Sequence, residues 1–134
     1  MEDQINNYNQ DISDTSAFKS NNEGSDLACN IMAIGVGGGG NNAVNHMYVQ
    51  GIKNVSFVNI NTDHQTLCHS RVPHTLEIGD GLGAGNKPEK ARDFAEESAE
   101  EIADLFDDQT KMVFITAGMG GGTGTGAAPV VARI

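Results

Sequence analysis

The sequence predicts an α/β protein with a Rossmann-like, mostly parallel sheet and flanking helices. Short apolar segments alternate with helical patterns, which is typical of βαβ units. These segments are almost continuously apolar, as expected for strands that are buried on both faces. In addition, 15 of the 17 glycines fall in three clusters, at 35–40, 79–85 and 118–126, each after a predicted strand. Ligands of open parallel sheets bind beyond the carboxyl ends of the strands, so we expect the clusters to line one crevice.

Two regions differ in composition. Residues 1–27 are rich in Asn, Asp, Ser and Gln without a periodic apolar pattern, which predicts a disordered polar tail. Residues 28–134 are predicted to form the N-terminal part of a domain. The chain stops at Ile134 inside a predicted helix, with no glycine, proline or capping residue to end it. We therefore expect a longer parent protein.

The first half of the domain predicts three strands and one helix. The apolar run 29–34 is the first predicted strand, and residues 35–40 are a predicted loop. Asn41 is the expected N-cap of a helix that continues to about Gln50, where Gly51 ends it. The β-branched run 55–60 is the second strand, 61–63 is a polar loop, and 75–78 is a shorter third strand.

The second half predicts a long helix, a strand and the start of another helix. Pro88 suits a first helical turn, and apolar residues recur at helical spacing as far as Phe106. Nine of the 18 acidic residues lie between Glu89 and Asp108, which predicts a solvated face; a surface for a charged partner is the alternative. Residues 111–116 are the next strand, and the third glycine cluster leads into the last helix.

Charge and composition exclude several classes of function. The formal net charge of -10 repels DNA and anionic lipid, so we expect no nucleic-acid partner. No apolar run approaches the ~20 residues of a membrane span, and the N-terminus lacks the features of a signal peptide. The two cysteines, Cys29 and Cys68, are expected to be reduced thiols. These features predict a cytoplasmic protein without direct membrane insertion.

The glycine clusters predict phosphate binding. Clustered glycines let a ligand approach backbone N–H donors, and a following helix N-terminus attracts anions. Residues 35–40 match G-x-G-x-x-G, and Asp63 ends the second strand, so a dinucleotide-binding module of an oxidoreductase is one hypothesis. Such a module needs only one glycine-rich turn. Three clusters favour a polyphosphate, which in this acidic chain also needs a cation.

Four segments resemble the tubulin/FtsZ superfamily of GTPases. Residues 120–126 match its signature, and the flanking residues resemble the branch that acts in bacterial cell division. Residues 34–44, 58–63 and 81–85 resemble further motifs of that branch, in the same order. The resemblance implies a truncated tubulin/FtsZ GTPase domain in residues 28–134. Asn41, Asn86 and Lys87 differ from many relatives, and the segment before Gly81 is shorter.

The resemblance implies roles for particular residues. The expected ligand is GTP or GDP with Mg²⁺, and Asp63 would approach the metal through water. No catalytic residue is expected in this chain, because the acidic catalytic loop would come from an adjacent subunit. The residues expected to bind the nucleotide are Gly37, Gly38, Gly39, Gly40, Asn41, Asn42, Asn61, Asp63, Gly83, Ala84, Gly85, Asn86, Gly120, Gly121, Gly122, Thr123, Gly124 and Thr125.

The resemblance also implies partners and a location. We expect self-association into head-to-tail filaments at the division site in the cytoplasm, and cell-division adaptors that bind a C-terminal region beyond this chain. A relative that assembles without hydrolysis remains an alternative. Lys87 is either a point charge for the γ-phosphate or a solvated lysine. A metal site formed by His64, Cys68, His69 and His74 is conceivable, although their spacing fits no familiar zinc pattern.

Overall fold

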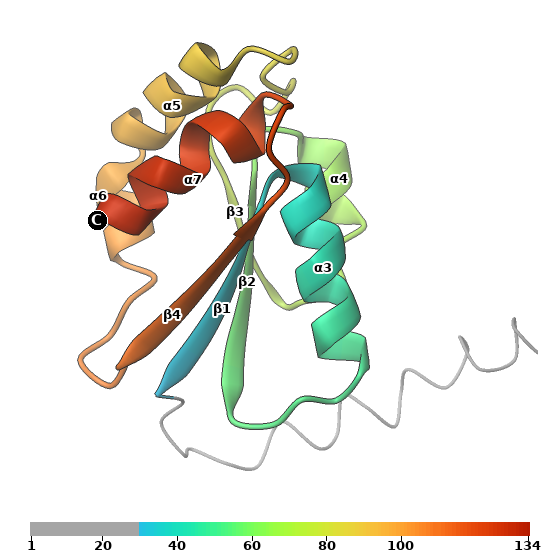
Figure 1. Ribbon diagram of the computed structural model, residues 1–134, viewed down its shortest axis with the longest axis vertical. Coiled ribbons are helices and arrows are strands. Elements are labelled where there is room, and N and C mark those ends of the chain that lie inside the picture. Colours follow the sequence, from blue (N-terminus) through green and yellow to red (C-terminus); the bar gives the residue numbers. More distant parts are fainter. Residues whose placement is uncertain (1–29) are drawn as a thin grey trace, which may run out of the picture.

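A computed structural model describes residues 30–134, which form one four-stranded sheet covered by helices (Figure 1). The predicted tail and Cys29 lie outside the described residues. The strands are β1 (Ile31–Val36), β2 (Val55–Asn61), β3 (His74–Glu77) and β4 (Met112–Ala117). Their order is β3-β2-β1-β4, and every neighbouring pair is parallel. The predicted fold class and all four predicted strands are confirmed, with ends that shift by one or two residues.

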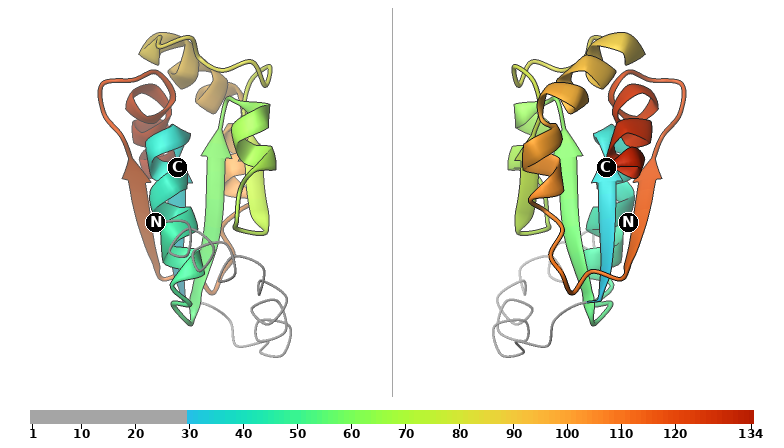
Figure 2. Two further views of the ribbon diagram at one scale, coloured as in Figure 1. Left: turned by 90° about the vertical axis from the view of Figure 1, so that its right-hand side faces the viewer. Right: turned by 90° about the vertical axis from the view of Figure 1, so that its left-hand side faces the viewer.

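Helices cover both faces of the sheet (Figure 2). On one side lie α3 (Gly37–Val49) and α4 (His64–Cys68); on the other lie α5 (Pro88–Glu97), α6 (Ala99–Ala103) and α7 (Thr123–Arg133). Side chains of β1 divide between the two faces. Ile34 and Val36 join the core beneath α5–α7, whereas Ala33 joins a smaller core with Val44 of α3. Burial on both faces explains why this strand is continuously apolar.

The start of α3 differs from the sequence prediction. The first strand extends through Gly35 and Val36, and the helix begins at Gly37 with Val36 as its N-cap. Asn41 is therefore not an N-cap but a buried residue within the helix. The prediction assumed that a polar side chain caps the helix, but no side chain caps the start of α3. The helix start lies close against the sheet, since a Cβ on Gly35 would lie 2.4 Å from the carbonyl oxygen of Gly40.

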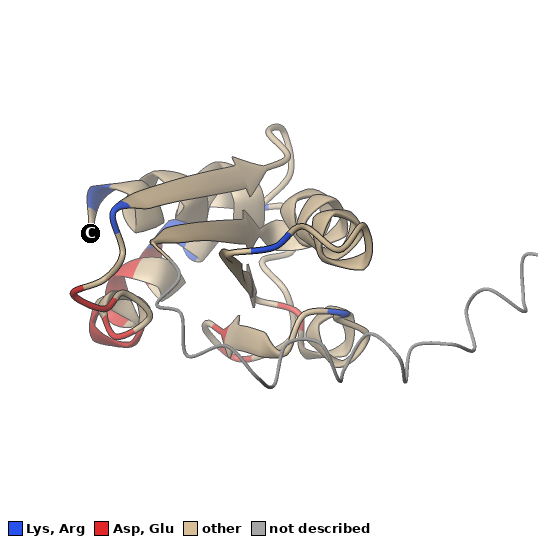
Figure 3. Ribbon diagram, turned by 90° about the horizontal axis from the view of Figure 1, so that it is seen from below, with Lys and Arg blue, Asp and Glu red and all other residues tan. Residues whose placement is uncertain are grey.

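The predicted long helix is divided into α5 and α6 at Ser98. Ser98 is buried and has φ -95° and ψ 17°, outside helical geometry. Its N–H still donates to Phe94 and its carbonyl accepts from Ile102, so the apolar spacing continues across the break. All nine acidic residues between Glu89 and Asp108 are exposed, as a solvated face and a surface for a charged partner both require. Figure 3 marks acidic positions along these helices in red.

The structure shows two other features of the helices that the sequence did not predict. The five-residue α4 was not predicted, because it is too short to show a helical period. The last helix begins at Thr123, inside the third glycine cluster, and contains Pro129.

Within residues 30–134, no helix combines the length and the apolar character needed to cross a membrane.

Candidate phosphate-binding crevice

The connections after all four strands meet at one edge of the sheet, as the arrowheads in Figure 1 indicate. Thr62, after β2, and Thr123, at the start of α7, are joined by a hydrogen bond of 2.7 Å between their hydroxyl oxygens. A Cβ on Gly122 would lie 3.0 Å from the Cβ of Ala84, and one on Gly39 would lie 3.5 Å from Gly118. The three glycine clusters are therefore direct neighbours in space.

The N-terminus of α3 presents backbone donors to this edge. The helix has no side-chain cap and no acidic residue in its first turn. Gly38 and Gly39 are exposed, and a Cβ on Gly38 would meet nothing within 4 Å. The first N–H groups of a helix have no intrahelical partner, and the helix dipole is positive there. This terminus therefore has the chemistry of an anion site.

The N-terminus of α7 has the same character. Gly122 is its N-cap, with no side-chain cap and no acidic residue in the first turn. The hydroxyl of Thr125 accepts a hydrogen bond of 2.9 Å from the N–H of Gly120, which folds the loop back on the helix. Gly124 is buried, and a Cβ there would lie 2.4 Å from the carbonyl oxygen of Gly118, so the packing requires glycine. Two uncapped helix termini thus lie at the same edge of the sheet.

The loop between β3 and α5 forms a further wall. Gly83 and Gly85 have φ of 87° and 60°, a region that suits glycine, and Asn86 also has a positive φ of 60°. The N–H of Gly83 donates to the carbonyl of Thr62 over 2.8 Å, which ties this loop to the end of β2. Ala84 is buried beside Gly122.

Asp80 stabilises the turn at the start of that loop. The N–H of Leu82 donates to the Asp80 carboxylate over 3.0 Å. This hydrogen bond, together with the Lys90 ammonium 3.6 Å away, holds the pKa of the Asp80 carboxyl below its ordinary value. The carboxylate is therefore the form that the folded loop favours.

Two residues that are predicted to contact the nucleotide use their side chains for hydrogen bonds within the protein. Asn41 donates to the carbonyls of Gly35 (2.8 Å) and Ile60 (3.2 Å), and it accepts from Asn61 (2.8 Å). The side-chain oxygen of Asn61 in turn accepts from the N–H of Thr62 over 2.8 Å. This buried network joins α3 to the ends of β1 and β2, and it sets the course of the loop after β2. Asn42, by contrast, is exposed.

The side chain of Asp63 caps a helix. One carboxylate oxygen accepts from the N–H groups of Gln65 (2.9 Å) and Thr66 (3.4 Å), so that Asp63 is the N-cap of α4. Sequence reasoning did not single out Thr62, which is fully buried and bonds Thr123. The signal available was its place between two predicted contacts, Asn61 and Asp63.

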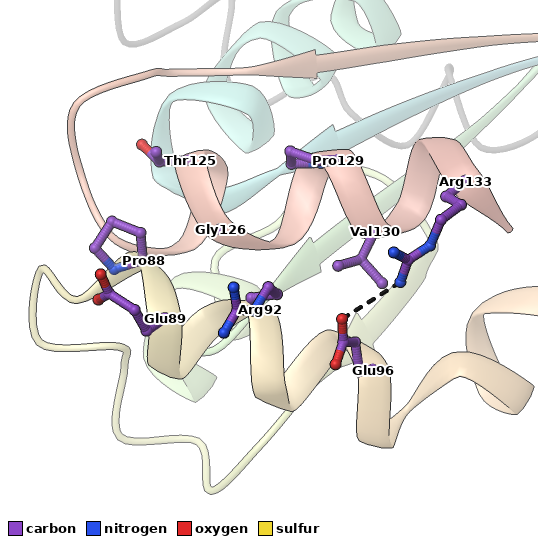
Figure 4. A pocket seen from close by; sticks show the side chains of 9 residues that line it. All are labelled: Pro88, Glu89, Arg92, Glu96, Thr125, Gly126, Pro129, Val130 and Arg133. Carbon is purple, nitrogen blue, oxygen red and sulfur yellow. Dashed lines mark hydrogen bonds and ion pairs between the residues drawn. The ribbon is translucent and has the colours of Figure 1, made fainter.

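A groove begins beside the glycine-rich turns, since Thr125 and Pro88 belong to its lining. The groove lies between α5 and α7, its lining also includes Arg92, Glu96 and Arg133, and a 3.3 Å ion pair joins the last two (Figure 4).

The suggested metal cluster does not form, since no three potential ligands among residues 30–134 are placed to hold a metal ion. Of its members, His64 bonds Glu77 and Cys68 instead.

The fold and the crevice define a parallel α/β domain whose ligand edge carries free helix-terminal amides. The chain belongs to the Tubulin/FtsZ family: the family's GTPase-domain model matches residues 30–134. It is 50% identical to the cell division protein FtsZ of Porphyromonas gingivalis over 139 residues, which is 100% of this chain and 28% of that protein. It is 54% identical to the FtsZ of Aquifex aeolicus over 109 residues, 78% of this chain and 29% of that protein.

Solved structures agree with this assignment. The empty FtsZ dimer of M. jannaschii superposes with a TM-score of 0.74 and 41% identity, covering 90% of this chain and 35% of that one. The GTPγS-bound protofilament of CetZ2 from Haloferax volcanii gives a TM-score of 0.67 and 31% identity, covering 77% of this chain and 34% of that one. The chain thus spans about a third or less of the length of these relatives.

Proposed function

We propose that this chain supplies the phosphate-binding part of a GTP-binding, polymer-forming GTPase that acts in bacterial cell division. The observation that carries the proposal is the pair of uncapped helix N-termini, α3 and α7, at one crevice. The names of the relatives support the rest: two are cell division proteins, and one structure is a GTPγS-bound protofilament. The cytoplasmic division site is the expected location.

The proposed contacts divide into two kinds. Backbone amides of the exposed glycines Gly38, Gly39 and Gly121 bind phosphate oxygens directly. Thr123 and Thr62 share a hydroxyl hydrogen bond beside them, so Thr123 is oriented to donate or accept at the phosphate edge. Asn41 and Asn61 fix the positions of α3 and of the loop after β2 through their buried hydrogen-bond network.

A divalent cation fits the same proposal. A nucleoside triphosphate in a protein of net charge -10 needs a neutralising ion, and Mg²⁺ prefers to keep several waters. One oxygen of Asp63 caps α4, so the other oxygen would hold a metal-bound water. Bound Mg²⁺ would neutralise negative charge on the phosphates.

We propose that hydrolysis is completed between subunits. A head-to-tail contact is heterologous, and it generates a filament when it does not close. An acidic loop of a neighbouring subunit would then reach the crevice, so that turnover depends on assembly. Cell-division adaptors would bind a C-terminal region of the whole protein.

Nucleotide competition on the full-length protein tests this function. We expect GTP and GDP to displace a fluorescent GTP analogue at matched Mg²⁺, and NAD to leave it bound at about 100-fold excess. Displacement by NAD would favour the oxidoreductase module instead. Turnover per subunit is expected to rise with protein concentration. Binding without turnover at any concentration would identify an assembly protein that does not hydrolyse GTP.

Lys87 offers a test of γ-phosphate contact. Its amide lies beside Gly122 and its side chain is exposed at the crevice wall. We expect Lys87→Ala to weaken GTP binding about 3- to 10-fold and GDP binding less than about twofold, because only GTP carries the third phosphate. Calorimetric titration of both nucleotides measures this difference. The matched control is Lys90→Ala, since Lys90 pairs with Asp80 instead. Equal losses for GTP and GDP would show that Lys87 is a solvated lysine.

A further inference from the structure

Cys68, His64 and Glu77 form a hydrogen-bonded chain on the surface, and His64 directly follows Asp63, the N-cap of α4. The thiol sulfur of Cys68 lies 3.3 Å from Nε2 of His64. The other ring nitrogen of His64, Nδ1, lies 2.5 Å from the Glu77 carboxylate. His64 and Cys68 are four residues apart on α4 and therefore share one face of the helix. Glu77 reaches them from the end of β3.

The carboxylate determines which ring nitrogen carries the proton. An ionised carboxylate can only accept a hydrogen bond, so Nδ1 of neutral His64 must be the donor to Glu77. Nε2 then carries the lone pair, and it faces the Cys68 thiol. His64 is therefore placed to accept the thiol proton, with the orientation that a nucleophile, a base and a supporting group require.

The backbone holds this chain of side chains in place. The N–H of His64 donates to the carbonyl of Gly81 over 2.9 Å. A Cβ on Gly81 would lie 2.7 Å from a carboxylate oxygen of Glu77, so the glycine leaves room for that carboxylate. The neighbouring His69 differs, because its Nδ1 contacts the carbonyl of Gln65 instead of the thiol. Cys68 is exposed, so reagents can reach the sulfur.

We propose that Cys68 is a modification site: a nucleophilic thiol, assisted by His64 and Glu77, that undergoes exchange with low-molecular-weight disulfides. Nε2 of His64 accepts the proton of Cys68, and the sulfur attacks one sulfur of the disulfide. A new S–S bond forms on Cys68 while the disulfide's own S–S bond breaks. The departing thiolate takes the proton from His64, so the products are a mixed disulfide and one free thiol.

Site-resolved alkylation of the full-length protein tests the assignment. Iodoacetamide at pH 7 labels thiols, and peptide mass spectrometry reports the rate at Cys68 alone. We expect His64→Gln to slow labelling of Cys68 about 5- to 10-fold and Glu77→Gln about 2- to 4-fold. His69→Gln is the matched control, and its rate should stay within about twofold of the original. The order should be the same for mixed-disulfide formation with oxidised glutathione.

Local unfolding of a variant cannot account for slower labelling of Cys68. Cys68 is already exposed, so unfolding would not slow its labelling. In urea the rates of all variants should converge, because the side chains are then no longer held together. A His64→Gln rate within about twofold of the original, or an equal loss in His69→Gln, would overturn the proposal. Neither outcome depends on nucleotide binding.

Discussion

Gly40→Ala is expected to lower the free energy of unfolding by about 2–4 kcal/mol. A Cβ at this position would lie 2.2 Å from the carbonyl oxygen of Thr116, a separation that real Cβ atoms do not adopt. The oxygen belongs to the backbone of β4, so the collision can be relieved only by moving α3 away from the sheet. Chemical denaturation followed by far-UV circular dichroism measures the loss.

Gly38→Ala is the matched control on the same helix. A Cβ there would meet nothing within 4 Å, so the fold does not require this glycine. The free energy of unfolding should stay the same or rise by up to about 1 kcal/mol, from helix propensity. Under the proposed function the same variant should bind GTP at least about 10-fold more weakly, because the methyl group obstructs the approach of phosphate to the helix amides. Equal stability of the two variants would contradict the packing argument.

Asn41→Ala is expected to destabilise the protein by about 2–4 kcal/mol. The substitution removes the side-chain hydrogen bonds to Gly35 and Ile60 and leaves the buried amide of Asn61 without its acceptor. An unpaired buried donor costs its full desolvation free energy, whereas most of an exposed side chain's hydrogen bonding is replaced by water. Denaturation midpoints and amide hydrogen exchange at the end of β2 measure the effect.

Asn42→Ala provides the comparison for Asn41. Asn42 is exposed on the same helix turn, so its removal should change the free energy of unfolding by less than about 0.5 kcal/mol. If Asn42 contacts the nucleotide, as the family resemblance implies, the variant should lose GTP affinity while remaining stable. An Asn41→Ala protein that kept full stability but lost nucleotide binding would instead support direct contact by Asn41.

Several elements could be predicted because their signals are local. The strands are visible as short apolar runs, Pro88 marks the start of α5, and three glycine clusters follow strand ends. Other elements could not, since tertiary packing decides them. The break at Ser98 occurs within an uninterrupted helical pattern, and the start of α3 at Gly37 has no capping side chain.

Within the candidate site, too, some features could be predicted from the sequence and others only from the tertiary structure. The residues alone indicated that glycine-rich turns follow the strands, and the family resemblance implied that Asn41 and Asn61 contact the nucleotide. The sequence could not distinguish a side chain that faces a ligand from one that holds the loop, because both are polar and lie in the same motif. The hydrogen bonds of Asn41 and the burial of Thr62 make that distinction.

The sequence by itself determined the parallel α/β class and the positions of the glycine-rich turns, because buried strands and glycine clusters are visible in the local composition. Only the tertiary structure decided which glycines are needed for packing and which are free to present amides. Gly40 meets the backbone of β4, whereas Gly38 meets nothing, although the two stand in one glycine run. The difference depends on what approaches each residue from a distant part of the chain.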